Sequence, residues 1–340
     1  MDRAAPIIKA DDVAYPILQA PDLDLQETFL LDFGMHRVAR TDDCLYMRGK
    51  GPQPFIHITQ LGEKKFVGMA FEACSQEDVA RLSLTEGFSA IEPMDSPGGG
   101  VRTYEFDPDG NRIELIFGRE RRAVEDGLAS QEINVGGVDH SNFRRLNQIK
   151  RFNKGAAPRI KRFGHIAIHM SDVEASLGWY NRHLGIIATD IVKPPPADED
   201  TPVGGIFSRL DRGEKPSDHH SIFMIATSAL TGHTPGLNHV SYEMVDIDDV
   251  FMGHEMLEKA GYELEWGIGR HYLGSQIFDY WRSPFGHVHE HQTDGDVFDN
   301  SVPPLLVNSG EVGDPNDPAR AQSQWGPSLN PDTFGDARGL

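Results

Sequence analysis

The sequence predicts an α+β protein of two domains, and three observations support this fold class. The chain has 340 residues, which is long for one ordinary domain and enough for two hydrophobic cores. Short apolar runs typical of strands alternate with segments whose apolar residues recur every three or four positions, as in helices. The order of strand, helix and several strands occurs in the first half and again in the second. We therefore expect about four related modules, two in each domain.

In the first half, four apolar stretches predict strands and two amphipathic stretches predict helices. The strand segments are YPILQA (15–20), PFIHITQL (54–61), FVGMAFEA (66–73) and TYEFDPDGNRIELIFG (103–118). The helix segments are LDLQETFLLDFGM (23–35) and SQEDVARLSLTEGF (75–88). In each module the helix is therefore expected to follow the first strand.

The second half repeats this order. Strands are predicted in FGHIAIHM (163–170), SDHHSIFMIA (217–226), LNHVSYEMV (237–245) and IFDYWRSPFGHVHEH (277–291). A helix is predicted in SDVEASLGWYNRHLG (171–185), with Ser171 and Asp172 as N-cap residues, and another in DIDDVFMGHEMLEKAGY (246–262). Aligning the halves places Gly68 on His239, Glu114 on Glu290 and, more loosely, Tyr15 on His165.

Composition divides the chain into four parts. Residues 1–120 form the N-terminal module pair, and residues 121–160 form a basic linker with few apolar side chains. Residues 161–297 form the C-terminal pair. Residues 298–340 are rich in Pro, Gly, Asn and Asp and predict an irregular arm, in which Trp325 and Leu329 favour wrapping against the domain.

Charge and cysteine content exclude several classes of function. The 32 basic and 52 acidic residues give a net charge of −20, which disfavours nucleic acid and anionic membrane surfaces as partners. No apolar run approaches the length of a membrane span, and the N-terminus has no apolar signal region. Only Cys44 and Cys74 occur, which suits a reducing compartment. We expect a cytoplasmic protein.

Histidines are concentrated in the second half, and 12 of the 15 lie between residues 165 and 291. The stretch GHVHEH ends the last predicted strand, where alternation sends His287, His289 and His291 to one face and Glu290 to the other. We expect the three histidines on the outer face, in solvent or at a subunit contact. Glu290, which the repeat reproduces as Glu114, is the better candidate for an interior ligand.

Two further histidines share the repeated strand positions. His239 lies in LNHVSYEM, with Asn238 and Val240 expected on the other face, and His165 opens FGHIAIH. Two neutral imidazoles and one carboxylate leave three adjacent open positions on a metal, an arrangement suited to non-haem Fe(II). Mn(II) can use the same ligands, whereas zinc more often has a fourth protein ligand or a single water position.

The motifs GHIAIHMSD…WYNRHLG, LNHVSYEMVDIDDV and GRHYLGSQIFDYWRSPFGHVHEHQTDGD resemble a known family. They are similar to those of the type I extradiol catechol dioxygenases of the vicinal oxygen chelate superfamily, which include 2,3-dihydroxybiphenyl and catechol 2,3-dioxygenases. The resemblance covers residues 10–296. It implies four βαβββ modules, with each domain an open, barrel-like mixed sheet, and it implies that His165, His239 and Glu290 are the iron ligands.

The same resemblance implies further site residues. His220 in SDHHSIFMIA matches the acid/base histidine, and its neighbour His219 is an alternative that strand alternation would turn away. His271 and Tyr280 in GRHYLGSQIFDY match a histidine and a tyrosine that flank the metal site. In the first half Tyr15 and Gly68 stand opposite the histidine ligands, so that half is expected to bind no metal.

The implied reaction inserts both atoms of O2 into a catechol next to the diol and gives a 2-hydroxymuconic semialdehyde-type product. The expected substrates are 2,3-dihydroxybiphenyl or an alkyl- or carboxy-substituted catechol, and the insertion KPPPADEDTPVGG (193–205) is a candidate for shaping their pocket. The resemblance also implies a homo-oligomer. The alternative is a metal-dependent isomerase or transferase of the same superfamily.

Overall fold

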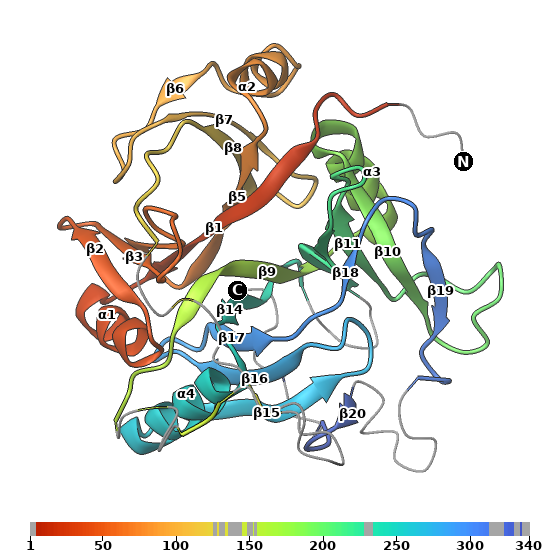
Figure 1. Ribbon diagram of the computed structural model, residues 1–340. Coiled ribbons are helices and arrows are strands. Elements are labelled where there is room, and N and C mark those ends of the chain that lie inside the picture. Colours follow the sequence, from red (N-terminus) through yellow and green to blue (C-terminus); the bar gives the residue numbers. More distant parts are fainter. Residues whose placement is uncertain are drawn as a thin grey trace.

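The computed structural model contains two large mixed sheets, one from each half of the chain (Figure 1). The described residues are 5–124, 128, 133–134, 145–147, 152, 155–227, 234–312, 323–329 and 334. The first sheet and its helices run from red to yellow in Figure 1, and the second runs from green to blue. No described helix has both the length and the apolar composition that a bilayer-crossing segment needs.

The N-terminal half contains two modules, each with its helix after the first strand. The first module comprises β1 (Ala10–Ala20), α1 (Leu23–Asp32), β2 (His36–Arg40), β3 (Cys44–Arg48) and β4 (His57–Leu61). The second comprises β5 (Lys65–Ala73), α2 (Gln76–Ser83), β6 (Glu92–Pro93), β7 (Val101–Phe106) and β8 (Arg112–Phe117).

The C-terminal half contains the other two modules. The third comprises β9 (Ile160–Met170), α3 (Val173–Leu184), β10 (Ile186–Lys193), β11 (Gly205–Leu210), β12 (Ser217–Asp218) and β13 (Ile222–Ala226). The fourth comprises β14 (Gly236–Met244), α4 (Ile247–Ala260), β15 (Glu263–His271), β16 (Ile277–Arg282) and β17 (Val288–Thr293). The remaining strands are β18 (Val297–Phe298), β19 (Leu305–Asn308) and β20 (Ser323–Trp325).

The order of strands confirms the predicted repeat. The first sheet runs β2-β3-β4-β1-β5-β8-β7-β6, and the second runs β19-β10-β11-β13-β9-β14-β17-β16-β15-β20. When the edge strands β19 and β20 are left out, the strands of the second sheet follow the same order, module by module, as those of the first sheet. The register agrees as well, because Tyr15 pairs with Ala70 and Ala70 with Glu114, as His165 pairs with Ser241 and Ser241 with Glu290.

Short polar side chains begin all four helices of the described residues, as the sequence predicted for α3. The N-caps are Asp22, Ser75, Asp172 and Asp246, whose side chains accept hydrogen bonds from backbone N–H groups of the first turn. At α3 only one of the two predicted capping residues has this role. Asp172 caps the helix, whereas the Ser171 hydroxyl donates to Asp109 at 2.5 Å and ties α3 to the first half.

The structure corrects the expectation for the histidines of β17. Alternation does separate them from Glu290, but His287, His289 and His291 are fully buried rather than solvated. They face the N-terminal half, where His291 stacks on Phe33 with ring centroids 3.8 Å apart. One hydrophobic cluster runs continuously from β5 and α1 into β9 and β14, so this face of β17 is enclosed by the packing of the two halves.

The chain after β17 is less irregular than expected. Strand β19 extends the second sheet beside β10, and β20 extends it beside β15. Leu329 packs against a small cluster that contains Trp266 and Tyr280. Much of the predicted linker at 121–160, and part of the arm at 298–340, lie outside the described residues.

Candidate metal centre

Three strands of the second sheet bring His165, His239 and Glu290 to one point. Nε2 of His165 lies 3.2 Å from Nε2 of His239 and 3.1 Å from Oε2 of Glu290. Nε2 of His239 lies 3.6 Å from the same Glu290 oxygen. The three side chains come from the adjacent strands β9, β14 and β17, and all three are buried.

These three donors have the geometry of a metal site. Two ligand atoms about 2.1 Å from an ion, and at right angles around it, lie roughly 3 Å apart. The observed separations of 3.1–3.6 Å are close to this value. Because His165 and His239 also line the apolar cavity described below, an ion held by the three donors would lie next to that cavity.

A bulge in β14 adds Asn238 to the site. The register with β9 shifts between Leu237 and His239, which leaves Asn238 as the extra residue and ends the simple alternation there. The sequence predicted Asn238 on the face opposite His239, and this prediction was wrong. The bulge places the Asn238 side chain beside His239. Its Oδ1 accepts a hydrogen bond from His239 Nδ1 at 2.7 Å, which leaves Nε2 of His239 unprotonated for a metal.

Burial and mutual proximity set the charges at the centre. Burial lowers the pKa of His239 to about 3, so this ring is neutral at physiological pH. Burial alone would raise the pKa of the Glu290 carboxyl, but the imidazoles of His165, His271 and His239 hold it well below its usual range. A neutral His239 imidazole and an ionised Glu290 carboxylate are protonation states that metal coordination requires.

His271 and Tyr280, at the end of β15 and in β16, lie together beside Glu290. His271 Nε2 is 2.7 Å from the Tyr280 hydroxyl and 3.5 Å from Glu290 Oε1. Tyr280 pairs with Glu290 across β16 and β17, and burial next to that carboxylate raises the pKa of its hydroxyl well above the usual value. Tyr280 is therefore a protonated hydrogen-bond donor at the rim of the centre.

His220 lies on the other side of His165, with the two ring centroids 4.1 Å apart. Burial, followed by the proximity of His165, holds the pKa of His220 well below its usual range. The dipeptide of His219 and His220 precedes β13, so strand alternation does not govern it. His219 nevertheless lies behind His220, with its Nδ1 atom 3.0 Å from His220 Nδ1.

An apolar cavity of about 380 Å³ opens onto this centre. Its walls include His165, His239, His220, His271 and Tyr280. The rest of the lining is mainly aromatic and aliphatic: Val192, Pro194, Phe207, Phe223, Ile225, Trp266, Leu273, Leu329 and Phe334. Both ends of the 193–205 insertion contribute, through Pro194 and the pair Gly204 and Gly205. No lysine or arginine is among the described residues that line it.

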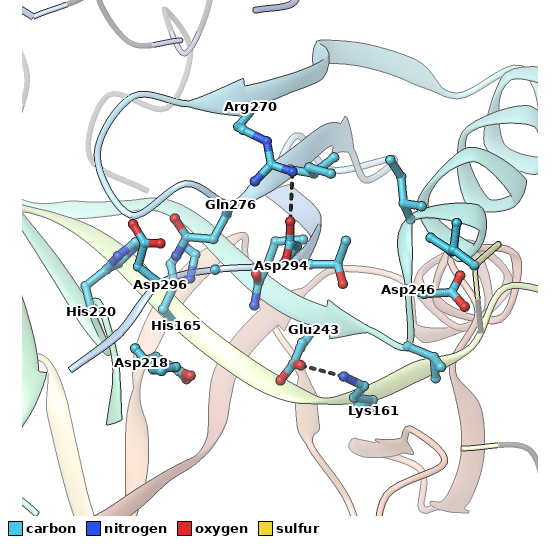
Figure 2. A pocket seen from close by; sticks show the side chains of 18 residues that line it. Lys161, His165, Asp218, His220, Glu243, Asp246, Arg270, Gln276, Asp294 and Asp296 are labelled. Atoms are coloured by element: carbon cyan, nitrogen blue, oxygen red, sulfur yellow. Dashed lines mark hydrogen bonds and ion pairs between the residues drawn. The ribbon is translucent and has the colours of Figure 1, made fainter. Parts of the chain in front are cut away.

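A second cavity, of about 530 Å³ and more polar, also reaches His165 and His220 (Figure 2). Two ion pairs cross its wall, Lys161 with Glu243 at 2.7 Å and Arg270 with Asp294 at 2.8 Å. The two histidines therefore separate an apolar chamber from a polar one. Neither the polar cavity nor Asn238 was foreseen from the sequence, because the residues involved are distant in the chain or displaced by a bulge.

The equivalent place in the first sheet has different chemistry. The Tyr15 hydroxyl donates to Glu114 Oε2 at 2.9 Å, and Arg112 Nε lies 2.9 Å from Glu114 Oε1. A Cβ atom at Gly68 would lie 1.8 Å from the carbonyl oxygen of Arg112, so no side chain fits in place of the histidine. The Glu114 carboxylate is thus engaged by Tyr15, by Arg112 and, at 3.5 Å, by Arg102.

Comparison with known proteins agrees with this architecture. The family model described as the Glyoxalase/Bleomycin resistance protein/Dioxygenase superfamily matches residues 162–290. Metapyrocatechase 2 of Cupriavidus necator is 28% identical over 316 residues, which cover 92% of this chain and 88% of that protein.

Solved structures share the fold over nearly the whole chain. The Mn(II)-bound glyoxalase from Novosphingobium aromaticivorans gives a TM-score of 0.72 at 22% identity, covering 96% of this chain and 94% of that one. Homoprotocatechuate 2,3-dioxygenase from Brevibacterium fuscum, in complex with 3,4-dihydroxyphenylacetate, gives 0.73 at 18% identity, covering 98% and 94%. Residues 162–290 therefore match a domain of the glyoxalase, bleomycin resistance protein and dioxygenase superfamily, and the chain has the two-domain vicinal oxygen chelate fold of these solved structures.

Proposed function

We propose that the protein is an extradiol ring-cleaving dioxygenase that inserts both atoms of O2 into a substituted catechol beside the diol. The observation that carries this proposal is the convergence of His165, His239 and Glu290 next to an apolar cavity that the two histidines line. Three ligands on one side leave room for two reactants on the other. The similarity to Metapyrocatechase 2, whose name denotes this class of activity, supports the same conclusion.

We assign Fe(II) as the resident metal, and the same three ligands would also hold Mn(II). When bound, the metal would supply Lewis acidity toward the catechol oxygens and redox capacity toward O2. The protein contributes the remaining groups. In this assignment Asn238 orients the His239 ring, and the buried setting excludes bulk water from the reacting atoms.

The other polar residues of the cavity have distinct roles in the proposal. His220, held neutral by burial, would accept the proton of a catechol hydroxyl and return it to an oxygen of the opening ring. Tyr280 would donate a hydrogen bond to a substrate oxygen, and His271, whose Nε2 atom lies 2.7 Å from the Tyr280 hydroxyl, would donate to the bound catecholate. The His220 ring lies against His165, whereas His271 lies beside Glu290 and Tyr280 beside His239.

The lining of the cavity favours a catechol with an uncharged substituent. Its walls are mainly aromatic and aliphatic, and no described residue that lines it could pair with a carboxylate as a lysine or arginine would. An aryl- or alkyl-substituted catechol, such as 2,3-dihydroxybiphenyl or 3-methylcatechol, would bury apolar surface there. A carboxylate-bearing catechol would lose hydration without gaining an ion pair.

The test is anaerobic purification with metal analysis, followed by addition of each catechol in air. We expect about one iron per chain, oxygen uptake, a yellow ring-fission product, and faster turnover of 2,3-dihydroxybiphenyl than of 3,4-dihydroxyphenylacetate. The variant His239→Ala should abolish both the metal and the product. Tightly bound zinc or nickel with no oxygen uptake would instead favour an isomerase, the alternative that the fold of the Mn(II)-bound glyoxalase keeps open.

A homo-oligomeric state and a cytoplasmic location complete the proposal. The two cysteines, Cys44 and Cys74, are both free thiols, which suits a reducing compartment. Light scattering coupled to size-exclusion chromatography would measure the oligomeric state directly.

A further inference from the structure

A buried chain of hydrogen bonds leads from Asp190 to His220. Asp190 Oδ2 lies 2.8 Å from His219 Nε2, and His219 Nδ1 lies 3.0 Å from His220 Nδ1. Asp190, His219 and His220 are 5%, 2% and 4% exposed, so solvent does not compete for these contacts. The chain ends at a residue that lines both cavities of the centre.

The polarity of this chain is set at its Asp190 end. An ionised carboxylate only accepts hydrogen bonds, so Nε2 of His219 must carry the proton of that contact. A neutral His219 then offers Nδ1 as an acceptor, and Nδ1 of His220 must donate to it. In a neutral His220 the opposite ring nitrogen, Nε2, is left without a proton. One carboxylate thereby fixes the tautomers of two imidazoles.

The local fold holds the components of this chain in place. A register shift between Ala188 and Asp190 makes Thr189 the extra residue of a bulge in β10, next to the strand position of Asp190. The Thr189 hydroxyl donates to the backbone carbonyl of His219 at 2.7 Å. Arg209, which is buried, donates to the Thr189 hydroxyl at 3.0 Å and provides positive charge near Asp190.

Packing also restricts the His219 ring. The rings of Phe207 and Phe298 lie 5.4 Å and 5.7 Å from it, centroid to centroid. A Cβ atom at Gly274 would lie 2.9 Å from His219 Nδ1, so the polypeptide backbone passes close to this ring at a residue that has no side chain. The ring therefore has little space in which to rotate away from Asp190 and His220.

We propose that Asp190 and His219 are positioning residues that fix His220 in the Nδ1–H tautomer, so that its Nε2 atom is the proton acceptor for the substrate. This inference rests on the proposed function. In the step it describes, an O–H bond of the catechol breaks, an N–H bond forms at His220 Nε2, and the electron pair stays on the catechol oxygen. The proton remains on the His220 ring until an oxygen of the product takes it.

Two measurements test this inference, and only one depends on turnover. The first is the ¹⁵N chemical shift of the His220 ring nitrogens in the protein loaded with Zn(II), a diamagnetic ion. We expect the Nδ1–H tautomer in the parent protein and a mixture of tautomers in Asp190→Leu. The second is steady-state kinetics of the iron-loaded protein, where we expect kcat of Asp190→Leu to fall about 100-fold with KM nearly unchanged.

Two more variants complete the design. Asp190→Asn, which keeps the shape of the side chain, should also reduce the Nδ1–H fraction of His220. This variant replaces Asp190→Leu in both measurements if the leucine variant fails to fold. Asp211→Asn, which removes another carboxylate near Arg209, should leave both the tautomer and kcat unchanged. An Nε2–H tautomer in the parent, or an unchanged tautomer in both Asp190 variants, would overturn the inference. A parent protein with the expected tautomer but no oxygen uptake would overturn the proposed function instead, and leave the positioning of His220 supported.

Discussion

Nε2 of His165 lies 3.1 Å from Oε2 of Glu290, and the internal repeat places the Tyr15 hydroxyl 2.9 Å from Oε2 of Glu114 in the same relationship. The strand register that creates the pair is the same in both sheets. The difference is chemical, because an imidazole nitrogen is a metal ligand whereas a protonated phenol is a hydrogen-bond donor. The two glutamates are therefore a matched pair for experiments.

The first prediction compares Glu290→Gln with Glu114→Gln. The amide at position 290 loses the negative charge that a cation requires, so bound metal should fall at least about tenfold, as measured by metal analysis after dialysis. At position 114 the carboxylate contacts Tyr15 and Arg112, and its replacement should lower stability and leave the metal content unchanged. Equal loss of metal in both variants would contradict the assignment of the site to the second half.

The second prediction concerns the hydroxyl of Tyr280. Tyr280→Phe removes the partner of His271 Nε2 and a donor at the rim of the centre, so kcat should fall by about 10- to 100-fold. The metal content should not change, because Tyr280 is not among the three converging ligands. Tyr272→Phe, at an exposed position next to His271, is the control and should behave like the parent. Unaltered turnover of Tyr280→Phe would remove Tyr280 from the mechanism.

The third prediction concerns two glycines within helices. In α4, a Cβ atom at Gly253 would lie 2.7 Å from Cε1 of His291, a ring already fixed by stacking on Phe33 and by a hydrogen bond to the Phe33 carbonyl. Alanine gains about 1 kcal/mol of helix propensity, but overpacking costs about 1–3 kcal/mol. Gly253→Ala should therefore be neutral to destabilising by about 2 kcal/mol.

Gly178 in α3 is the control for this experiment. Apart from its chain neighbours and the backbone of α3, no atom of a described residue lies within 4 Å of the position its Cβ would take, so Gly178→Ala should raise the free energy of unfolding by up to about 1 kcal/mol. Urea unfolding of both variants gives the comparison. A stabilised Gly253→Ala would show that α4 does not pack against the histidine face of β17 as closely as described.

The fourth prediction concerns the pH dependence of stability. Burial, then the proximity of His289 and Lys64, lowers the pKa of His287 to about 3, whereas the pKa of an unfolded histidine is about 6.5. Between these values the unfolded chain binds a proton that the folded chain does not. The free energy of unfolding should therefore decrease as pH falls below 6.5, by up to about 1.4 kcal/mol per pH unit for this residue.

His287→Gln isolates this contribution, because glutamine does not titrate. Urea unfolding at pH 7.5, 6.0 and 5.0 should show that the free energy of unfolding falls less steeply with decreasing pH in the variant than in the parent. The difference in slope should correspond to about one proton fewer taken up on unfolding. Identical slopes would mean that His287 is protonated as readily in the folded chain as in the unfolded one, and therefore that it is accessible to water.

Local patterns in the sequence predicted much of the fold. Apolar periodicity located the helices and most strands, and the alignment of Glu114 with Glu290 revealed the repeat that the strand register reproduces. The alternation in GHVHEH correctly separated Glu290 from the histidines. These features follow from the two-residue period of a strand and the 3.6-residue period of a helix, which depend only on neighbours in the chain.

Other features were decided only by tertiary structure. Phe33, which is more than 250 residues away from His291 in the sequence, covers the face of β17 that carries the histidines. The sequence predicted that this face meets solvent or another subunit, and that prediction was wrong. The bulges at Thr189 and Asn238 add one residue to a strand without a signature in the local sequence, yet they place Asp190 and Asn238 beside the two histidines they contact. Residue types and periodicity thus determined the candidate ligands, whereas the pairing of distant strands determined which polar groups surround them, because hydrogen-bond partners are set by distance in space.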